Sequence, residues 1–290
     1  MSTVSETANT RVWWMYGEYT KENLMKMDPV MLRAILHERT HHTIEVEIYH
    51  ILLGRKPMPP GFGLQPQLIY EVWQERGLPE DSDDIKWVKQ YLELARKMRH
   101  GEKVDLTIPA PVPFSEPEMA TVNKLIYTRT SIRDWASKEV PDWMTQKILE
   151  AGRAAPTGCN LSVARFIVIK DPEEQKMVWS DIPVTNAVLI VLCYDRRVYE
   201  VIGQDRSVPQ NMMLDCGAAA DHMLLMAHAL GLAGIWLTCR ENTAWAFKTQ
   251  YGLPDYIKVA MHIAVGWGAC GILKSGRTPL SEMVITRKKP

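Results

Sequence analysis

The chain has 290 residues, of which 46% are hydrophobic, which is enough for one large domain or for a domain with an extension. Lysine plus arginine and aspartate plus glutamate both number 34, so the formal net charge is zero. A nucleic-acid partner would favour a basic face, so we do not expect nucleic acid as the main partner. The five cysteines are scattered without a Cys-x-x-Cys pair, which indicates neither a disulfide framework nor a zinc knuckle.

The N-terminus carries no targeting pattern. Residues 1–10 lack the basic and apolar segments of a secretory signal, and the chain has no run of about 18 apolar residues. We therefore expect a cytoplasmic protein that does not enter a membrane. A reducing compartment also suits the unpaired cysteines.

The first part of the chain is predicted to be helical. Apolar residues recur at spacings of three and four, and Gly54 and Pro57 end the longest run. The predicted helices are Lys21–Leu53, about Gln67–Arg76, and Ile85–His100. We therefore expect an all-helical extension over residues 1–105, followed by a stiff proline-rich linker over residues 106–118.

The pattern changes in residues 119–290, where buried strands alternate with helices. Near-continuous apolar runs are typical of strands that are covered on both faces of a sheet. A long helix rich in alanine, leucine and methionine is predicted at about Met212–Leu230, and Gly231 is expected to cap it. The predicted strands are Arg165–Ile169, Val188–Tyr194, Gly234–Thr238 and Val259–Gly266.

A stretch between these two patterns brings together cationic and turn-forming residues. It begins with Arg129-Thr130-Ser131-Ile132-Arg133, continues as an amphipathic helix over Val140–Ala151, and ends with Pro156-Thr157-Gly158-Cys159-Asn160. The arginine guanidinium has a planar fork of donors that suits a phosphate group. Arg129 and Arg133 flank Ser131, so both could bind one anion. Taken alone, the same pattern also fits two surface arginines in a turn.

In this order, these residues resemble the N-terminal half of the FMN-dependent nitroreductase fold. Two later pieces add to the resemblance: Asp215–Leu232 with the strand after it, and Val265-Gly266-Trp267-Gly268 followed by Lys274–Val284. The resemblance covers roughly residues 120–290. It implies an α+β fold with a mixed, mainly antiparallel sheet flanked by helices, and a homodimer with FMN at the subunit interface.

The resemblance also implies which residues bind FMN. The phosphate contacts fall on Arg129, Ser131 and Arg133, with Arg277 and Lys274 from the far end of the chain. In this family the Pro-Thr turn contacts flavin from the neighbouring subunit, and backbone N–H groups near Leu237 and Thr238 face flavin N5. The implied cofactor-binding residues are Arg129, Thr130, Ser131, Arg133, Pro156, Thr157, Gly158, Asn160, Leu237, Thr238, Lys274 and Arg277.

The sequence departs from the family pattern after Asn160. The family usually has Gln-Pro-Trp there, and this chain has Ser162-Val163-Ala164. The change leaves the phosphate contacts intact and puts the usual substrate preference in doubt. The variable segment of the family is short here, Arg196–Asn211, so it would form only part of a lid over the site.

One motif in the extension competes with this interpretation. His37-Glu38-Arg39-Thr40-His41 matches His-Glu-x-x-His, in which the two histidines share a helix face and could bind zinc. Arg39 is atypical between such histidines, and a third ligand at a suitable spacing is not evident. Glu38 and Glu47 also begin Glu-x-x-His patterns, but the spacing of nine residues turns them to opposite faces. The alternative is a solvated polar face of a helix.

The resemblance therefore implies an oxidoreductase that passes hydride through FMN between NADH or NADPH and a small aromatic or conjugated substrate. No side chain is assigned a catalytic role and no metal is assigned. Alternatives are a reductive dehalogenase or an oxygen-dependent flavin-cleaving enzyme of the same fold, a metal-dependent hydrolase centred on His37, Glu38 and His41, and a non-catalytic flavin-binding protein. We expect residues 1–105 to pack on the dimer and to narrow access to the flavin.

Overall fold

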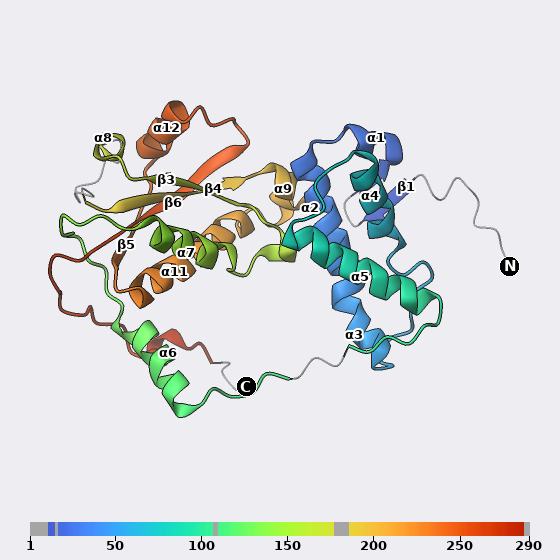
Figure 1. Cartoon of the computed structure of the whole chain (residues 1–290), viewed down its shortest axis with the longest axis horizontal. Helices are drawn as coiled ribbons and strands as arrows, with labels where there is room; N and C mark the ends of the chain where they lie inside the picture. Colours follow the sequence, from blue (N-terminus) through green and yellow to red (C-terminus); the bar gives the residue numbers. More distant parts are fainter. Residues whose placement is uncertain (1–10, 15–16, 107–109, 177–185, 287–290) are drawn as a thin grey trace.

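The computed structural model describes residues 11–14, 17–106, 110–176 and 186–286. The chain forms two lobes that touch along one side and are joined by the segment that leads into α6, Glu116–Thr128 (Figure 1). The N-terminal lobe is mainly helical. Its helices are α1 Lys21–Lys26, α2 Pro29–Thr40, the π-helical turn η2 His41–Glu45, α3 Val46–Leu52, α4 Leu64–Glu75 and α5 Asp83–Arg99.

The predicted helix over Lys21–Leu53 is interrupted. Asp28 caps α2 by accepting a hydrogen bond from the Val30 N–H at 2.8 Å, and Pro29 occupies the first turn. Proline fits there because its missing N–H would have no partner in the helix, whereas it disfavours helical backbone in the residue before it. The Asp-Pro pair is therefore a helix start that the apolar spacing alone does not reveal.

The expectation of an all-helical extension missed a short hairpin. β1, Arg11–Trp14, pairs antiparallel with β2, Gly17–Thr20, in a register that places Arg11 opposite Thr20. This hairpin leads directly into α1, where the Thr20 side chain accepts a hydrogen bond from the Asn23 N–H at 3.2 Å. The rest of the described extension is helical, as predicted.

The second lobe is built on a four-stranded antiparallel sheet in the order β3-β4-β6-β5. A single parallel bridge between Ser131 and Gly234 adds to its edge, so the predicted mixed, mainly antiparallel sheet is confirmed. All four predicted strands are present with ends shifted by one or two residues. They are β3 Ala164–Ile169, β4 Val188–Asp195, β5 Ala233–Leu237 and β6 Ile257–Gly266.

Helices cover both faces of this sheet, so β4 and β6 are buried on both sides (Figure 1). On one face lie α7, Asp142–Arg153, and α11, Asn211–Ala229, whose apolar residues pack with Ile190, Leu192 and Ile263. On the other lie α12, Glu241–Gln250, and the shorter α8, Pro172–Gln175. Among the described helices, including α13 at Leu280–Met283, none is long and apolar enough to cross a membrane.

The core of the N-terminal lobe continues into the second lobe. Buried residues of α2, α4 and α5 share one cluster with Leu161, Val163 and Ile202. The connection from β4 to α11, which contains α9 Arg197–Glu200 and α10 Gln204–Ser207, therefore lies under the helical lobe. Two polar contacts join this connection to the helical lobe. Arg197 pairs with Asp28 at 2.9 Å, and the Tyr19 hydroxyl donates to the Val201 carbonyl at 3.1 Å.

A buried histidine in the sheet gives an expected pH dependence. His262 on β6 is buried, and neither ring nitrogen has a partner among the described residues. Burial lowers the pKa of His262 to about 4 from the usual 6.5, so the folded state holds the imidazole neutral. As pH falls below 6.5 the unfolded chain takes up this proton first, and stability is lost progressively down to about pH 4.

We therefore expect the melting temperature to fall between pH 6.5 and 4, and to fall less in a His262→Leu variant. Thermal unfolding followed by circular dichroism across this range measures both. His228 has a pKa lowered in the same direction, so part of the dependence should remain. Parallel curves for the two proteins would contradict this role of His262.

Candidate cofactor-binding site

A cavity of about 840 Å³ opens where β5 begins, a size within the range of cofactor pockets. It lies between the ends of α6 and α11 and the segment after β6. Arg129 and Thr130 line it, together with the backbone of four glycines. The full lining is Thr121, Lys124, Leu125, Arg129, Thr130, Ile132, His228, Ala229, Gly231, Leu232, Ala233, Gly234, Gly268, Ala269, Cys270 and Gly271.

This cavity is electropositive. Arg129 and Lys124 are its charged lining residues, and no acidic side chain is among the lining residues. Burial first, and then the charges of Arg129 and Lys124, lower the pKa of His228, so this ring remains neutral. The Arg129 Nη1 atom is buried and has no hydrogen-bond partner in the described part of the chain. A buried unpaired guanidinium N–H is costly, and an anionic ligand would satisfy it.

The other residues predicted to bind phosphate lie near Arg129 or farther along the chain, outside the cavity lining. Ser131 forms the backbone bridge to Gly234, and the exposed Arg133 donates to the Ser131 carbonyl at 3.2 Å. Lys274 contacts the Tyr127 carbonyl at the end of α6. Arg277 is exposed and donates to its neighbour Gly276. One chain therefore places Arg129 and Thr130 in the cavity, and does not bring Arg277 to them.

The turn Pro156–Asn160 lies at the contact between the two lobes. Asp215 on α11 accepts hydrogen bonds from the Gly158 N–H at 3.0 Å and from the Tyr199 hydroxyl at 2.8 Å. Burial raises the pKa of Asp215, and these two donors oppose the rise. A Cβ atom at Gly158 would collide with the Tyr199 hydroxyl, so glycine is required by this close approach.

The turn and the cavity occupy separate parts of one chain. None of Pro156, Thr157, Gly158 and Asn160 lines the cavity at β5. The predicted N5-facing residues lie at the far end of β5, where Leu237 is buried and Thr238 is exposed. The implied FMN contacts are therefore divided among three places in the monomer.

The His-Glu-x-x-His stretch is buried, so the interpretation as a solvated helix face is wrong. His37, Glu38 and Arg39 are only 3%, 0% and 6% exposed. His37 contacts Asp84 at 2.9 Å and the Asn160 carbonyl at 3.2 Å, whereas His41 contacts Glu45 at 2.7 Å. The two histidines thus have different partners. Among the described residues, no group of three or more His, Cys, Asp or Glu side chains is arranged to hold a metal ion.

Glu38 is the centre of a charged network at this contact. It pairs with Arg39 through two hydrogen bonds and accepts one from His42 Nδ1 at 2.7 Å. Burial raises the pKa of Glu38, but the hydrogen bonds and charges of Arg39 and His42 outweigh it and lower the pKa. Glu38 is therefore a buried carboxylate whose charge is held by two cations.

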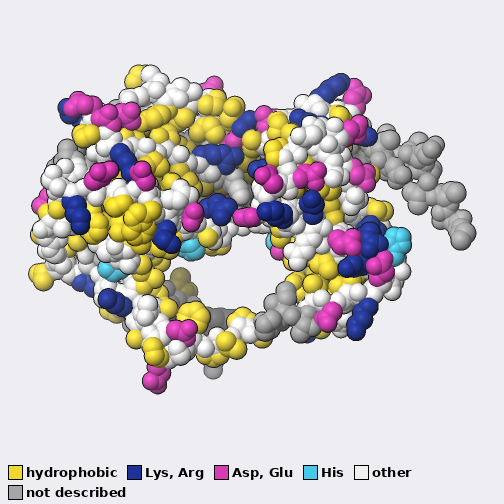
Figure 2. Space-filling view, viewed as in Figure 1, with side chains coloured by type: hydrophobic (Ala, Val, Ile, Leu, Met, Phe, Trp, Pro, Cys, Tyr) yellow, Lys and Arg dark blue, Asp and Glu magenta, His cyan; other side chains and the backbone are white. Residues whose placement is uncertain are grey.

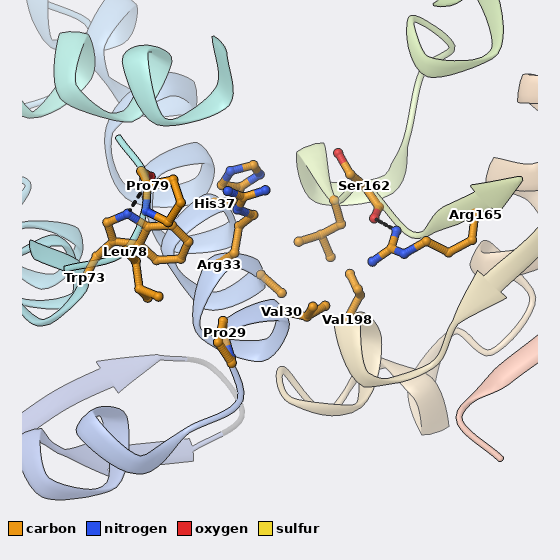
Figure 3. A pocket seen from close by; sticks show the side chains of 12 residues that line it. Pro29, Val30, Arg33, His37, Trp73, Leu78, Pro79, Ser162, Arg165 and Val198 are labelled. Atoms are coloured by element: carbon orange, nitrogen blue, oxygen red, sulfur yellow. Dashed lines mark hydrogen bonds between the residues drawn. The ribbon is translucent and has the colours of Figure 1, made fainter. Parts of the chain in front are cut away.

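A second cavity, of about 460 Å³, lies between the lobes (Figure 3). Arg33 and His37 of α2 and Trp73 of α4 face it from the helical lobe, and Ser162 and Arg165 face it from the other. The Arg33 guanidinium lies 5.1 Å from the centre of the Trp73 ring, and Arg165 donates to the Ser162 carbonyl at 2.8 Å. Its remaining lining is apolar: Pro29, Val30, Ala34, Leu78, Pro79, Leu161 and Val198.

This arrangement gives a physical reason for the departure from the family pattern. Leu161 and Val163 are fully buried in the shared core with the helical lobe. Ser162 lies between them and lines the interlobe cavity. In this chain Leu161 and Val163, which follow Asn160, therefore pack against the N-terminal lobe.

Sequence reasoning missed the polar contacts at and near the contact between the lobes. Asp215 was noted only as the first residue of a segment that resembles the family, and Arg197 and Asp28 gave no signal of pairing across 169 positions. Asp195 is fully buried and pairs with Arg197 at 2.7 Å. The sequence signal that could have found this pair is the acidic Asp195 directly after a strand predicted to be buried. A buried acidic residue needs a partner.

Comparison with known proteins agrees with the fold and site. The profile of the Nitroreductase family matches residues 126–188 and 178–267. An Archaeoglobus fulgidus protein named NADH dehydrogenase/NAD(P)H nitroreductase is 31% identical over 152 residues, which cover 50% of this chain and 83% of that protein. An NADPH-flavin oxidoreductase of Vibrio harveyi is 25% identical over 151 residues, 49% of this chain and 63% of that one.

Solved structures give the same result for the second lobe. A nitroreductase-type protein of Desulfovibrio desulfuricans, solved in complex with FMN, is 33% identical with a TM-score of 0.50, and the match covers 58% of this chain and 98% of that one. The NADPH:FMN oxidoreductase of Vibrio harveyi, solved with NAD⁺, is 23% identical with a TM-score of 0.52, covers 58% of this chain and 77% of that one, and supports the fold alone.

The fold and the cavity define an α+β protein with one helix-covered antiparallel sheet and a cationic cavity that fits a phosphorylated cofactor. The resemblance carried by Arg129–Asn160 is therefore confirmed. The chain belongs to the nitroreductase family.

Proposed function

We propose that this chain transfers hydride between NADH or NADPH and a small aromatic or conjugated substrate of the nitro, quinone or enone type. Membership of the family makes it an FMN-dependent NAD(P)H oxidoreductase that acts on small molecules. FMN supplies the hydride chemistry when bound, and the protein supplies binding and position. The observation that carries the proposal is the buried, unpaired Arg129 guanidinium in a cavity without acidic lining residues.

The residues of this chain would hold FMN as follows. Arg129 would bind the phosphate in the cavity, with Thr130 beside it and Ser131, Arg133, Lys274 and Arg277 as further donors. Backbone N–H groups near Leu237 and Thr238 would face the flavin ring, because main-chain donors there need no particular side chain. The turn formed by Pro156, Thr157, Gly158 and Asn160 would contact the flavin bound by a second copy.

We further propose that the site is completed in a homodimer. One chain does not join the turn to the Arg129 cavity, and α6 together with the C-terminal segment exposes apolar side chains (Figure 2). α6 buries none of its side chains, and Leu273 and Ile285 are 96% and 97% exposed. Exposed apolar surface of this kind marks association sites.

The helical lobe would stay packed on the second lobe and help to form the entrance to the flavin site. The described part of the extension, from Leu24 to Ala95, shares its core with described residues of the part over residues 119–290. Because the helical lobe also contacts Asn160 through His37, it would border the flavin of the second copy and restrict which substrates enter.

The hydride-transfer proposal is tested with the purified protein. We expect the absorption spectrum of oxidised flavin, and we expect that spectrum to bleach when NADH or NADPH is mixed anaerobically in a stopped-flow instrument. Addition of a quinone or nitroaromatic compound should restore it. Flavin that binds but is not reduced by either nicotinamide would favour a non-catalytic flavin-binding protein.

The proposed homodimer is tested by the mass of the protein in solution. Light scattering should give the mass of a dimer, about twice 33.1 kDa. Leu273→Asp, which places a charge on an exposed apolar residue of the C-terminal segment, should weaken the dimer and the flavin content together. Lys176→Asp, on the surface at the end of α8, is the control. A monomer with full flavin occupancy contradicts the shared site.

A further inference from the structure

The interlobe cavity has a mainly apolar lining and one arginine on each side (Figure 3). Its volume of about 460 Å³ lies within the range of small-molecule pockets. Arg33 faces it from the helical lobe and Arg165 from the sheet lobe, and none of the described residues that line it is acidic. An occupant of this cavity would therefore meet two guanidinium groups and no carboxylate.

The wall formed by the helical lobe holds its arginine against an aromatic ring. Arg33 lies 5.1 Å from the centre of the Trp73 ring, and Trp73 Nε1 donates to the Pro79 carbonyl at 3.0 Å, which fixes the ring. An Asp84 oxygen lies 3.5 Å from Arg33 Nε but only 2.9 Å from His37. The terminal nitrogens of Arg33 have no recorded partner in the described part of the chain, so they keep donors for an acceptor in the cavity.

The opposite wall holds the second arginine by its own backbone. Arg165 Nη1 donates to the Ser162 and Ala164 carbonyls at 2.8 and 2.9 Å. Asp195 lies 3.4 Å from Arg165 but accepts shorter hydrogen bonds, of 3.0 and 2.7 Å, from Arg197. Partial burial lowers the pKa of the Arg165 guanidinium, because its charge loses hydration there. An anion beside this group would stabilise its charged form.

We propose that the interlobe cavity binds a small organic molecule with one carboxylate group and a flat apolar body. The carboxylate would accept hydrogen bonds from Arg33 and Arg165, because the planar fork of a guanidinium matches the two oxygens of a carboxylate. The body would lie among the apolar side chains of the lining, which include Val30, Leu161 and Val198. Because most of the lining is apolar, an organic anion fits this cavity better than inorganic phosphate does.

The cavity is open to solvent and its charged groups are already in place. The side chains of Arg33 and Arg165 are 39% and 38% exposed, so a ligand can reach them from outside. Both are held by the contacts described above, which lowers the cost of ordering them on binding. The linings of this cavity and of the cavity at β5 share no residue, so the proposal does not rest on the flavin chemistry.

The test is isothermal titration calorimetry of the full-length protein with naphthylacetate, with its uncharged amide naphthylacetamide, and with inorganic phosphate. Naphthylacetate should bind about tenfold more tightly than naphthylacetamide, because hydrogen bonds to a charged group are roughly twice as strong. Phosphate should bind more weakly than naphthylacetate, since it has no apolar body. The proposal is overturned if naphthylacetate does not bind, or if either of the other two compounds binds as tightly.

A matched pair of variants shows where the probe binds. Arg165→Gln removes one guanidinium and should weaken the binding of naphthylacetate by at least about tenfold. Arg153→Gln changes an exposed arginine that lies in neither lining and should leave the affinity unchanged. An unchanged affinity in folded Arg165→Gln contradicts the proposed site, and the preference of the unaltered protein for the acid over the amide decides the matter if this variant does not fold.

Added FMN separates the two cavities. The affinity for naphthylacetate should stay the same when FMN is present in excess, because the two linings are distinct. An affinity that falls as FMN is added would place the probe in the cavity at β5 and overturn the proposal. The titration requires neither flavin reduction nor NAD(P)H, so its failure is separate from failure of the proposed function.

Discussion

Replacing Arg129 by alanine should weaken FMN binding by about 10- to 150-fold, because a charge-assisted contact contributes roughly 1.5–3 kcal/mol. Arg129 is the predicted phosphate ligand that the single chain places inside the cavity with a buried, unpaired Nη1 atom. Its guanidinium is therefore positioned before the ligand arrives. Fluorescence titration of the flavin-free protein with FMN measures the dissociation constant directly.

Two variants control for charge and for folding. Arg129→Lys keeps the positive charge but loses the planar fork of donors. Its FMN affinity should therefore lie between that of Arg129→Ala and that of the unaltered protein. Arg153→Ala removes an exposed arginine of α7, which lies outside the cavity lining, and should leave the affinity unchanged. If folded Arg129→Ala binds FMN as tightly as the unaltered protein does, the phosphate lies elsewhere.

Replacing Glu38 by alanine should destabilise the protein by about 3–5 kcal/mol, because it leaves buried Arg39 and the adjacent His42 without their common anion. Without Glu38 the two cations would lose the carboxylate to which both are hydrogen-bonded. The loss should appear in the unfolding transition that contains the helical lobe. Denaturant unfolding followed by tryptophan fluorescence reports on this region through Trp73 and Trp87.

The matched control lies on the next helix. Glu47 of α3 pairs with Lys56 at 2.6 Å near the surface, and Glu47→Ala should cost less than about 1 kcal/mol. Glu38→Gln keeps the shape of the side chain but not its charge, so its loss of stability should lie between those of Glu38→Ala and Glu47→Ala. Equal, small effects of Glu38→Ala and Glu47→Ala would show that the buried network contributes little to stability.

The sequence was sufficient for the parts of the fold that rest on local pattern. β4, β5 and β6 are largely buried apolar runs, whereas β3, which was also expected to be buried, is mostly half-buried. α11 is a long helix of small and apolar residues ended by Gly231. The Arg-x-Ser-x-Arg stretch was singled out by its resemblance to the nitroreductase family, and its residue types suit a phosphate. These features depend on side chains within about 20 positions of each other.

The sequence was insufficient where partners are far apart along the chain. Glu38 looked solvated because its immediate neighbours are polar, yet it is fully buried in α2, a helix that packs against the turn at Gly158–Asn160. Ser162-Val163-Ala164 was interpreted only as a departure from the family pattern, whereas Val163 packs in the core that the two lobes share. The interlobe cavity likewise requires the placement of α2 against α9, which local spacing does not encode.

The shared core has a consequence for synthesis of the protein. The helices of the N-terminal lobe leave the ribosome first, but Leu161, Val163, Ile202 and Met212 complete their core. At about 5–20 residues per second, roughly 100 further residues take about 5–20 s to make. During that delay the cluster lacks these four residues. The core of the N-terminal lobe is therefore completed only after the later half of the chain has been made.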